Sequence, residues 1–273
     1  MNLLLAAELA AIGAVAGVLG TLAGLGGGFI VIPVLRLFFG IAPATTAAVS
    51  LVMVFANSVS GSIAYLRQGR VDVRLAATVA ATGIPTSVLG AYLVGKISFT
   101  GFDVLYGLLL LFFSFYLLRR RNAPPPSTPL RVPSAGERVL VDARGERFAY
   151  ATSVPLSLLC GVILGLVSSF FGIGGGFIFV LFFIALLRMP AHIVAATSTF
   201  AILLTSPSGV IAHYLGGHID WNYAIPLSLG GLVGGQFGPR IARRLSSPQI
   251  LGVLGYLMLA AAAAMAARHF LKL

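Results

Sequence analysis

The stretch GLGGGF at residues 24–29 returns almost unchanged as GIGGGF at residues 172–177. Each copy places three consecutive glycines inside a long apolar run. A glycine in a helix interior costs roughly 1 kcal/mol relative to alanine. A triplet therefore predicts a break in the helix, and the repetition indicates that the chain needs two such breaks.

The composition around these stretches is that of a membrane protein. The 273 residues are 58% hydrophobic and 9% charged, whereas soluble domains carry about 25% charged residues. The net charge of +11 comes from basic residues at the ends of apolar runs and in residues 119–147, as expected for membrane topology. We therefore expect a protein embedded in the lipid bilayer that binds no nucleic acid. The single cysteine, Cys160, excludes a multi-cysteine metal site, and we expect neither a metal nor a cofactor.

The chain contains an internal duplication. The offset of 148 residues that relates Gly24 to Gly172 holds without a gap for about eighty residues. Apolar runs in the first copy lie near residues 3–23, 24–40, 43–66, 75–95 and 101–118. Those in the second copy lie near residues 151–171, 173–187, 191–213, 222–239 and 250–267. The runs that follow the glycines are short for a span of about 20 residues, so we expect half-spans or re-entrant segments there.

The basic residues indicate that the two copies are inverted. The loop around Gly69 carries Arg67, Arg70 and Arg74, whereas the loop around Gly217 carries no lysine or arginine. The next loop reverses this balance, with one basic residue in the first copy and three in the second: Lys96, Arg240, Arg243 and Arg244. Lysine and arginine prefer the cytoplasmic side. Corresponding loops therefore face opposite sides, which an odd number of crossings per copy, most simply five, would produce.

These patterns predict an all-α polytopic membrane protein. Two inverted-topology repeats, at residues 1–118 and 149–273, contain about five apolar segments each, with helices broken at the GGG motifs. A Pro/Arg-rich linker at residues 119–148 joins them, and we expect it to be cytoplasmic in a multi-pass protein of the inner (plasma) membrane. The stretch RVLVDARGERFAY at residues 138–150 alternates around a turn and predicts a β-hairpin. Inverted repeats with broken helices are typical of secondary transporters.

The glycine stretches suggest an anion site. A half-helix that begins after each break would point free N–H groups and its positive dipole end into the interior. The candidate backbone donors are Gly26, Gly27, Gly28, Gly174, Gly175 and Gly176. Close helix packing through small residues is the alternative explanation. A nucleotide site is excluded because Phe29 replaces the third glycine of G-x-G-x-x-G.

The next run in each copy is unusually polar for its depth. The candidate side-chain donors are Ser50, Asn57, Ser58, Thr197, Ser198, Thr205 and Ser206. Hydroxyls of this kind often bond only the preceding turn of their own helix. Asn57 aligns with Thr205 and is the strongest single candidate.

Few charged residues lie in the apolar runs. Arg36 is either a charge partner of the substrate at depth or an interfacial side chain. We place one acidic residue, Glu8, in an apolar run and expect no carboxylate proton relay. We expect Asp72 and Asp220 to cap helices. His192 and His213 titrate in a useful range, but we expect interfacial hydrogen bonds from them.

On these residues the sequence resembles the TauE/SafE (sulfite exporter, TSUP) family. The resemblance is carried by GLGGGF and GIGGGF, each followed by a small polar run containing Ser50 or Ser198. The pairs Gly69 with Asp72 and Gly217 with Asp220 follow these runs. The resemblance covers nearly the whole chain except the linker. It implies a bacterial or archaeal inner-membrane transporter for sulfite, sulfonates or other small organic anions.

We therefore expect a secondary transporter that exports sulfite, sulfonates or related organosulfur anions by alternating access. An anion channel, or a carrier for small carboxylates on the same fold, is the alternative. The chain has no HExxH, no GxSxG and no carboxylate pair at depth, so we do not expect an enzyme. The G-x-x-x-G patterns serve internal packing as well as dimerisation, so a homodimer stays open.

Overall fold

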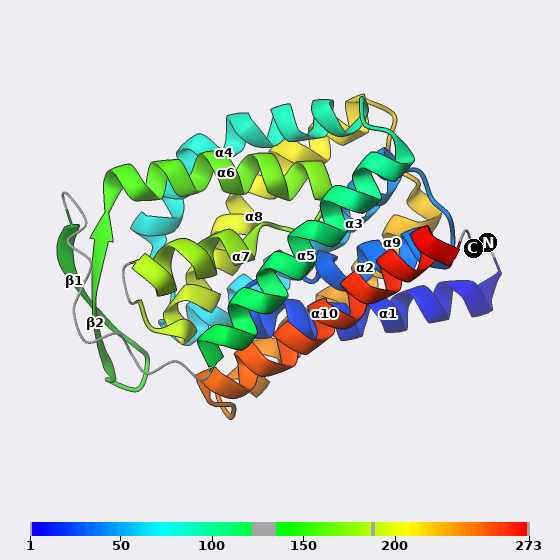
Figure 1. Ribbon diagram of the computed structural model, residues 1–273. Coiled ribbons are helices and arrows are strands. Elements are labelled where there is room, and N and C mark those ends of the chain that lie inside the picture. Colours follow the sequence, from blue (N-terminus) through cyan, green and yellow to red (C-terminus); the bar gives the residue numbers. More distant parts are fainter. Residues whose placement is uncertain (1, 122–134, 187–188, 272–273) are drawn as a thin grey trace.

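The computed structural model (Figure 1) describes residues 2–121, 135–186 and 189–271. The first half contains α1 (Leu3–Ala23), α2 (Gly28–Leu37), α3 (Pro43–Arg67), α4 (Val73–Val94) and α5 (Phe99–Arg121). The strands β1 (Ala135–Val141) and β2 (Arg147–Ser153) follow. The second half contains α6 (Val154–Phe171), α7 (Gly176–Phe179), the π-helical η1 (Val180–Leu186), α8 (Ala191–Leu215), α9 (Trp221–Ala242) and α10 (Ser247–Leu271).

The helices confirm the predicted all-α polytopic fold. Among the described residues, seven helices are long and apolar enough to cross a membrane. The segments after the glycine stretches are short, as predicted: α2 has 10 residues, and α7 has 4 before the chain becomes π-helical. The side chains of Asp72 and Asp220 accept backbone N–H bonds at the starts of α4 and α9, which confirms their expected capping role.

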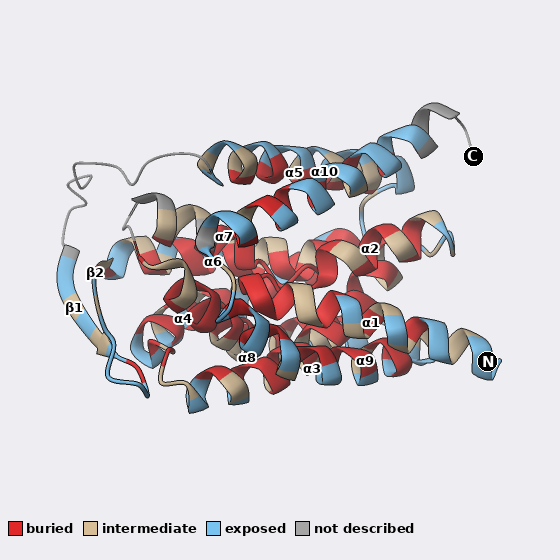
Figure 2. Ribbon diagram, turned by 90° about the horizontal axis from the view of Figure 1, so that it is seen from below, coloured by how far each residue is buried: buried red, intermediate tan, exposed pale blue. Residues whose placement is uncertain are grey.

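The helix contacts follow the sequence offset of 148 residues. Helix α1 packs along α9 as α6 packs along α4. A Cβ on Gly13 of α1 would collide with the carbonyl of Leu227, and a Cβ on Gly161 of α6 would collide with that of Val79. Both residues of one pair are related to those of the other by the same offset. Helices α3 and α8 are the most buried of the seven candidate spans among the described residues, and α5 pairs with α10 across one face (Figures 1 and 2). The opposite orientation of the copies in a membrane stays a prediction.

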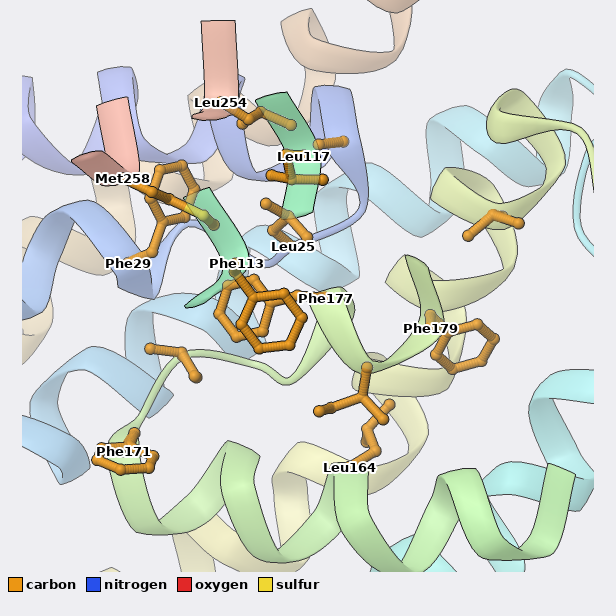
Figure 3. Packing of buried hydrophobic residues seen from close by; sticks show 14 of the residues in the cluster. Leu25, Phe29, Phe113, Leu117, Leu164, Phe171, Phe177, Phe179, Leu254 and Met258 are labelled. Atoms are coloured by element: carbon orange, nitrogen blue, oxygen red, sulfur yellow. The ribbon is translucent and has the colours of Figure 1, made fainter. Parts of the chain in front are cut away.

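The buried core joins α5 and α10 to the glycine segments. The ring of Phe113 from α5 lies 4.7 Å from the ring of Phe177, the second residue of α7 (Figure 3). Phe29 of α2 and Met258 of α10 belong to the same buried cluster. Exposed residues gather instead on the hairpin and on the outer surfaces of the helices (Figure 2).

The predicted hairpin forms and covers one end of the bundle. The start of α1 and the end of α10 lie at the opposite end (Figure 1). Strands β1 and β2 pair antiparallel, and Arg138 and Tyr150 both bond the carboxylate of Asp72 at 2.9 Å. The predicted linker at residues 119–148 contains regular structure at both of its ends, because α5 extends to Arg121 and the hairpin begins at Ala135 and continues to Ser153. Linker residues 122–134 lie outside the described residues, as does Arg188.

A second ion pair fixes the turn of the hairpin to the α3–α4 loop. The guanidinium of Arg70 lies 3.0 Å from the Asp142 carboxylate. Burial alone would raise the pKa of Asp142, but bonds from the Arg144 N–H, the Arg70 side chain and the Glu146 N–H together lower the pKa below its usual value. A lowered carboxyl pKa gives stability that is fully present above the ordinary aspartate pKa of about 4 and is lost as the pH falls through the lowered value.

We expect the protection of residues 135–153 against hydrogen–deuterium exchange, relative to free exchange at the same pH, to stay constant between pH 8 and 5. It should fall only in more acidic solution. Between pH 8 and 5, Asp142→Asn should raise exchange in this segment, because it removes the charged partner of buried Arg70; in more acidic solution the difference from the parent protein should disappear, because Asp142 is then itself neutral. Glu146→Gln is the matched control. Glu146 lies 3.6 Å from Arg70 but is 62% exposed, so its loss should change little. Equal protection in Asp142→Asn and the parent protein between pH 8 and 5 would contradict this assignment.

Candidate functional site

The two glycine stretches interrupt the helices in the interior of the bundle. Helix α1 ends at Ala23 and α2 begins at Gly28, while α6 ends at Phe171 and α7 begins at Gly176. The left-handed backbone region is occupied by three glycines in each break: Gly24, Gly26, Gly27, Gly172, Gly174 and Gly175, with φ between 72° and 88°. Only glycine adopts this conformation at little cost, which explains the residue type at these positions.

The two breaks lie against each other. A Cβ added to Gly26 would lie 3.4 Å from the Cα of Gly174, and the reverse distance is also 3.4 Å. A Cβ on Gly28 would collide with the carbonyl of Gly172, and a Cβ on Gly176 would collide with that of Gly24. Backbone therefore packs directly on backbone where the two copies meet. The six predicted glycines are brought together here, and their close packing agrees with the packing explanation as well.

Two serines cross-link the breaks. The Ser50 hydroxyl on α3 donates to the Gly172 carbonyl at 2.6 Å, and the Ser198 hydroxyl on α8 donates to the Gly24 carbonyl at 2.8 Å. These two hydrogen bonds are related by the offset of 148 residues. Each copy thus holds the glycine segment of the other copy, so movement of α3 or α8 would pull on the opposite break.

Asn57 also reaches the first break. Its Nδ2 donates to the Gly26 carbonyl at 3.1 Å, while its buried Oδ1 has no partner among the described residues. The hydroxyl of neighbouring Ser58 is likewise buried and without a described partner. Unpartnered buried polar atoms call for an explanation. Where the two breaks lie against each other, which we call the crossing, the side near Asn57 is therefore the part best suited to bind a polar ligand.

The remaining predicted hydroxyls are engaged elsewhere. Thr205 and Ser206 bond carbonyls one turn earlier in α8, as the backbone-bonding alternative expects. The Thr197 hydroxyl accepts the backbone N–H of Asp72 at 3.1 Å, at the hairpin end. Of the seven predicted side-chain donors, the structure therefore brings Ser50, Asn57 and Ser198 to the glycines. It engages Thr197, Thr205 and Ser206 in structural bonds and leaves the Ser58 hydroxyl without a described partner.

Arg36 is buried in an ion pair. Its Nε and Nη2 lie 2.7 and 2.6 Å from the two carboxylate oxygens of Asp103 on α5, and it also donates to the Ile41 carbonyl. This bidentate pairing favours a structural role for Arg36 at the junction of α2 and α5. The prediction that Glu8 is the one acidic residue of the apolar runs was wrong, because Asp103 lies in the run near residues 101–118.

His213 forms hydrogen bonds, as expected. Its side chain is fully buried within the protein, and its interfacial depth in the membrane stays a prediction. One ring nitrogen, Nε2, lies 2.9 Å from the Ser169 carbonyl, and the other, Nδ1, lies 3.1 Å from Nδ1 of His218. The burial could not be foreseen from its place near the end of an apolar run.

Comparison with known proteins identifies the family. The sequence profile named sulfite exporter TauE/SafE matches residues 9–265. The chain belongs to the TauE/SafE family. It is 28% identical to the probable membrane transporter protein YunE of Bacillus subtilis, over 90% of this chain and 92% of that protein. A probable membrane transporter of Methanocaldococcus jannaschii is 27% identical, over 94% and 96%. No solved structure matches the chain.

These relatives agree with the resemblance inferred from the glycine stretches. A shorter match, 31% identical over 40% of this chain and 23% of the other protein, is to the sulfite exporter TauE/SafE family protein 3 of Arabidopsis thaliana. The chain is therefore a multi-pass membrane transporter and not an enzyme.

We expect Gly28→Ala to destabilise the protein by about 1–3 kcal/mol, because the added methyl group would collide with the opposite break. Gly107→Ala is the matched control. A Cβ on Gly107 of α5 meets no described atom within 4 Å, so it should leave stability unchanged or raise it through helix propensity. Melting temperatures in detergent measure both changes. Equal melting of Gly28→Ala and Gly107→Ala would show that the breaks are not tightly packed.

Ser50→Ala and Ser198→Ala should each destabilise by about 1–3 kcal/mol, because each leaves a buried carbonyl without its hydroxyl donor. The double variant should deviate from additivity, since both bonds hold the same crossing. Thr78→Ala is the control: its hydroxyl is exposed and bonds only the preceding turn of its own helix. Thermal melting compares the two single variants, the double variant and the control with the parent protein. A double variant that melts at the temperature of the parent protein would show that the two serine hydrogen bonds do not stabilise the breaks.

Proposed function

We propose that this transporter exports sulfite, sulfonates or related small organosulfur anions across the inner membrane by alternating access. The observation that carries the proposal is the meeting of two broken helices, one from each copy, in the interior of a TauE/SafE family chain. The N–H groups of Gly28 and Phe29, in the first turn of α2, have no carbonyl partner in their own helix, whereas that of Ile30 donates to the carbonyl of the N-cap residue Gly27 at 3.1 Å. Helix starts of this kind favour a negative charge.

The polar groups at the crossing define the recognition chemistry. Backbone N–H groups near Gly27 and Gly28 would donate to the oxygens of the anion, with hydroxyl donation from Ser58. Asn57 lies at the same break through its bond to Gly26. Such a set has no fixed cation and therefore suits a transported anion, which must leave as readily as it binds. Sulfite and sulfonates present several oxygens in a small volume and match donors that converge from more than one element.

The hairpin end carries a feature suited to collecting anions. A cleft of about 90 Å³ is lined there by residues of both copies and of the hairpin: Arg67, Gln68, Arg70, Asp142, Ala143, Arg144 and Arg243. Four arginines against one aspartate make this cleft basic, and a basic cleft raises the local concentration of anions. Basic loops face the cytoplasm. We therefore place the hairpin and the linker at residues 119–148 on the cytoplasmic side, where an exporter would load.

Alternating access requires two arrangements of one frame. The duplicated contacts supply the frame, because α1 on α9 and α6 on α4 are the same packing made twice. The crossed Ser50 and Ser198 bonds couple the two breaks, so a change at one end is felt at the other. The two ends of the helix bundle are held by different contacts. Asp72 bonds the hairpin at one end, and His213 contacts His218 at the other.

We expect sulfite or a sulfonate to raise the melting temperature of the purified protein selectively. A ligand at 100 times its dissociation constant stabilises by about 2.7 kcal/mol. The panel contains sulfite, sulfoacetate, taurine, sulfate, small carboxylates and chloride at matched ionic strength and pH. Ser58→Ala should weaken the shift, whereas the control Thr78→Ala should not.

Flux into proteoliposomes then tests the transport mechanism with the anion that binds. Saturable flux at enzyme-like turnover, below about 10³ s⁻¹, would support alternating access, whereas much faster flux would favour a channel. If only carboxylates raise the melting temperature, the organosulfur assignment is wrong and a carboxylate carrier is favoured.

A further inference from the structure

The two copies contain an equivalent buried hydrogen bond that is made by different side chains. The Tyr65 hydroxyl donates to the Thr21 carbonyl at 2.8 Å, and His213 bonds the Ser169 carbonyl at 2.9 Å. The offset of 148 residues relates both members of one pair to those of the other. Both side chains are buried, at 2% and 0% exposure. The second copy thus places an imidazole, a group that can bind a second proton, where the first copy has a phenol.

The hydrogen bonds fix the protons of the buried imidazole. A carbonyl can only accept, so Nε2 of His213 carries a hydrogen and its Nδ1 is the acceptor in the neutral ring. Nδ1 of His218, 3.1 Å away, must then be the donor. His218 is half-buried in the α8–α9 loop, next to exposed Gly216 and Gly217. The pair therefore joins the edge of the bundle to its interior.

One added proton can be accommodated by a shift along this pair. The proton binds at Nε2 of His218, and the hydrogen on Nδ1 of His218 passes to Nδ1 of His213. His213 is then an imidazolium that donates from both nitrogens, and His218 is again neutral. A second proton would set two N–H groups against each other across 3.1 Å. The pair is thus built for one proton.

The described residues packed around His213 include hydroxyls that have no partner of their own. The hydroxyls of Ser87 on α4 and Ser169 on α6 are buried without described partners, and a Cβ on Gly209 would lie 2.5 and 2.6 Å from them. Gly209 precedes His213 by one helical turn. No carboxylate in the described part of the chain forms a salt bridge with His213.

The charged groups nearest to this end are already engaged. Lys96 follows α4 and lies over the Tyr92 ring, and Asp220 caps α9. Burial of an unpaired charge is unfavourable, so an imidazolium at His213 would favour an anion in the interior.

We propose that the His213–His218 pair is a proton-binding site, and that the protein takes up one proton there with each anion it binds. This inference rests on the proposed function only for the identity of the bound species as an anion. The proton and the anion each reduce the unfavourable burial of the other. Affinity for an anion of constant charge should therefore rise as the pH falls, by up to tenfold per pH unit for one coupled proton.

The proton site is tested without substrate by nitrogen NMR of the protein labelled at histidine. The chain has four histidines, so the signals are few enough to assign with single variants. We expect His213 to carry its hydrogen on Nε2 at pH 8, and the pair to gain one shared proton by pH 5. In His213→Tyr, which restores the residue of the first copy, the proton shared between the two rings should be lost. Absence of proton uptake by the pair, or independent uptake of two protons, would overturn the proposal.

The coupling is tested with methanesulfonate, which stays ionised throughout this range. Calorimetry at constant pH in buffers of different ionisation enthalpy counts protons, and we expect about one per bound anion in the parent protein. His213→Tyr should bind methanesulfonate with no pH dependence, because the hydroxyl keeps the bond to Ser169 but does not titrate. The control His192→Asn, at the opposite end of α8, should keep the pH dependence.

The outcomes separate the two proposals. Binding of methanesulfonate without proton uptake in the parent protein would overturn the coupling and leave the proposed function standing. A parent protein that binds no sulfonate and no sulfite at any pH would overturn the proposed function and the coupling together. Equal pH dependence in His213→Tyr and the parent protein would show that the proton binds elsewhere.

Discussion

The contact between the two glycine segments is the constraint on which the rest of the structure depends. At this contact the backbone of one break lies directly against the backbone of the other, because no side chain separates Gly26 from Gly174. Ser50 and Ser198 then tie helices α3 and α8 to the opposite breaks. In a bilayer, apolar side chains gain little by leaving lipid for protein, so close packing and hydrogen bonds must hold helices together. Glycine supplies the first, and the crossed serines supply the second.

The same logic extends to the outer helices. The seams of α1 with α9 and of α6 with α4 place glycines against carbonyls at corresponding positions, as at Gly13 and Gly161. Such seams have little freedom to adjust by repacking side chains. Movement between the copies would therefore occur as displacement of whole helices, which suits a transporter that exchanges two arrangements of a repeated frame.

Divergence on the repeated frame gives its two ends different properties. Tyr65 and His213 bond equivalent carbonyls, one with a phenol hydroxyl and the other with an imidazole. Arg70 and His218 are also equivalent in sequence. Arg70 binds the hairpin through Asp142, whereas His218 contacts His213. One end is thus held by ion pairs and the other by a pair of histidines.

The sequence by itself determined the membrane fold, the duplication, the helix breaks, the caps at Asp72 and Asp220, and the hairpin. The duplication follows from the constant offset of 148 residues, and the other features follow from composition and local backbone preference. Only the tertiary structure decided which polar groups meet. Asp103 lies 67 residues from Arg36, and Ser50 lies 122 residues from Gly172. Such pairs depend on how helices cross, and no local pattern of hydrophobicity encodes a crossing between segments so far apart in the chain.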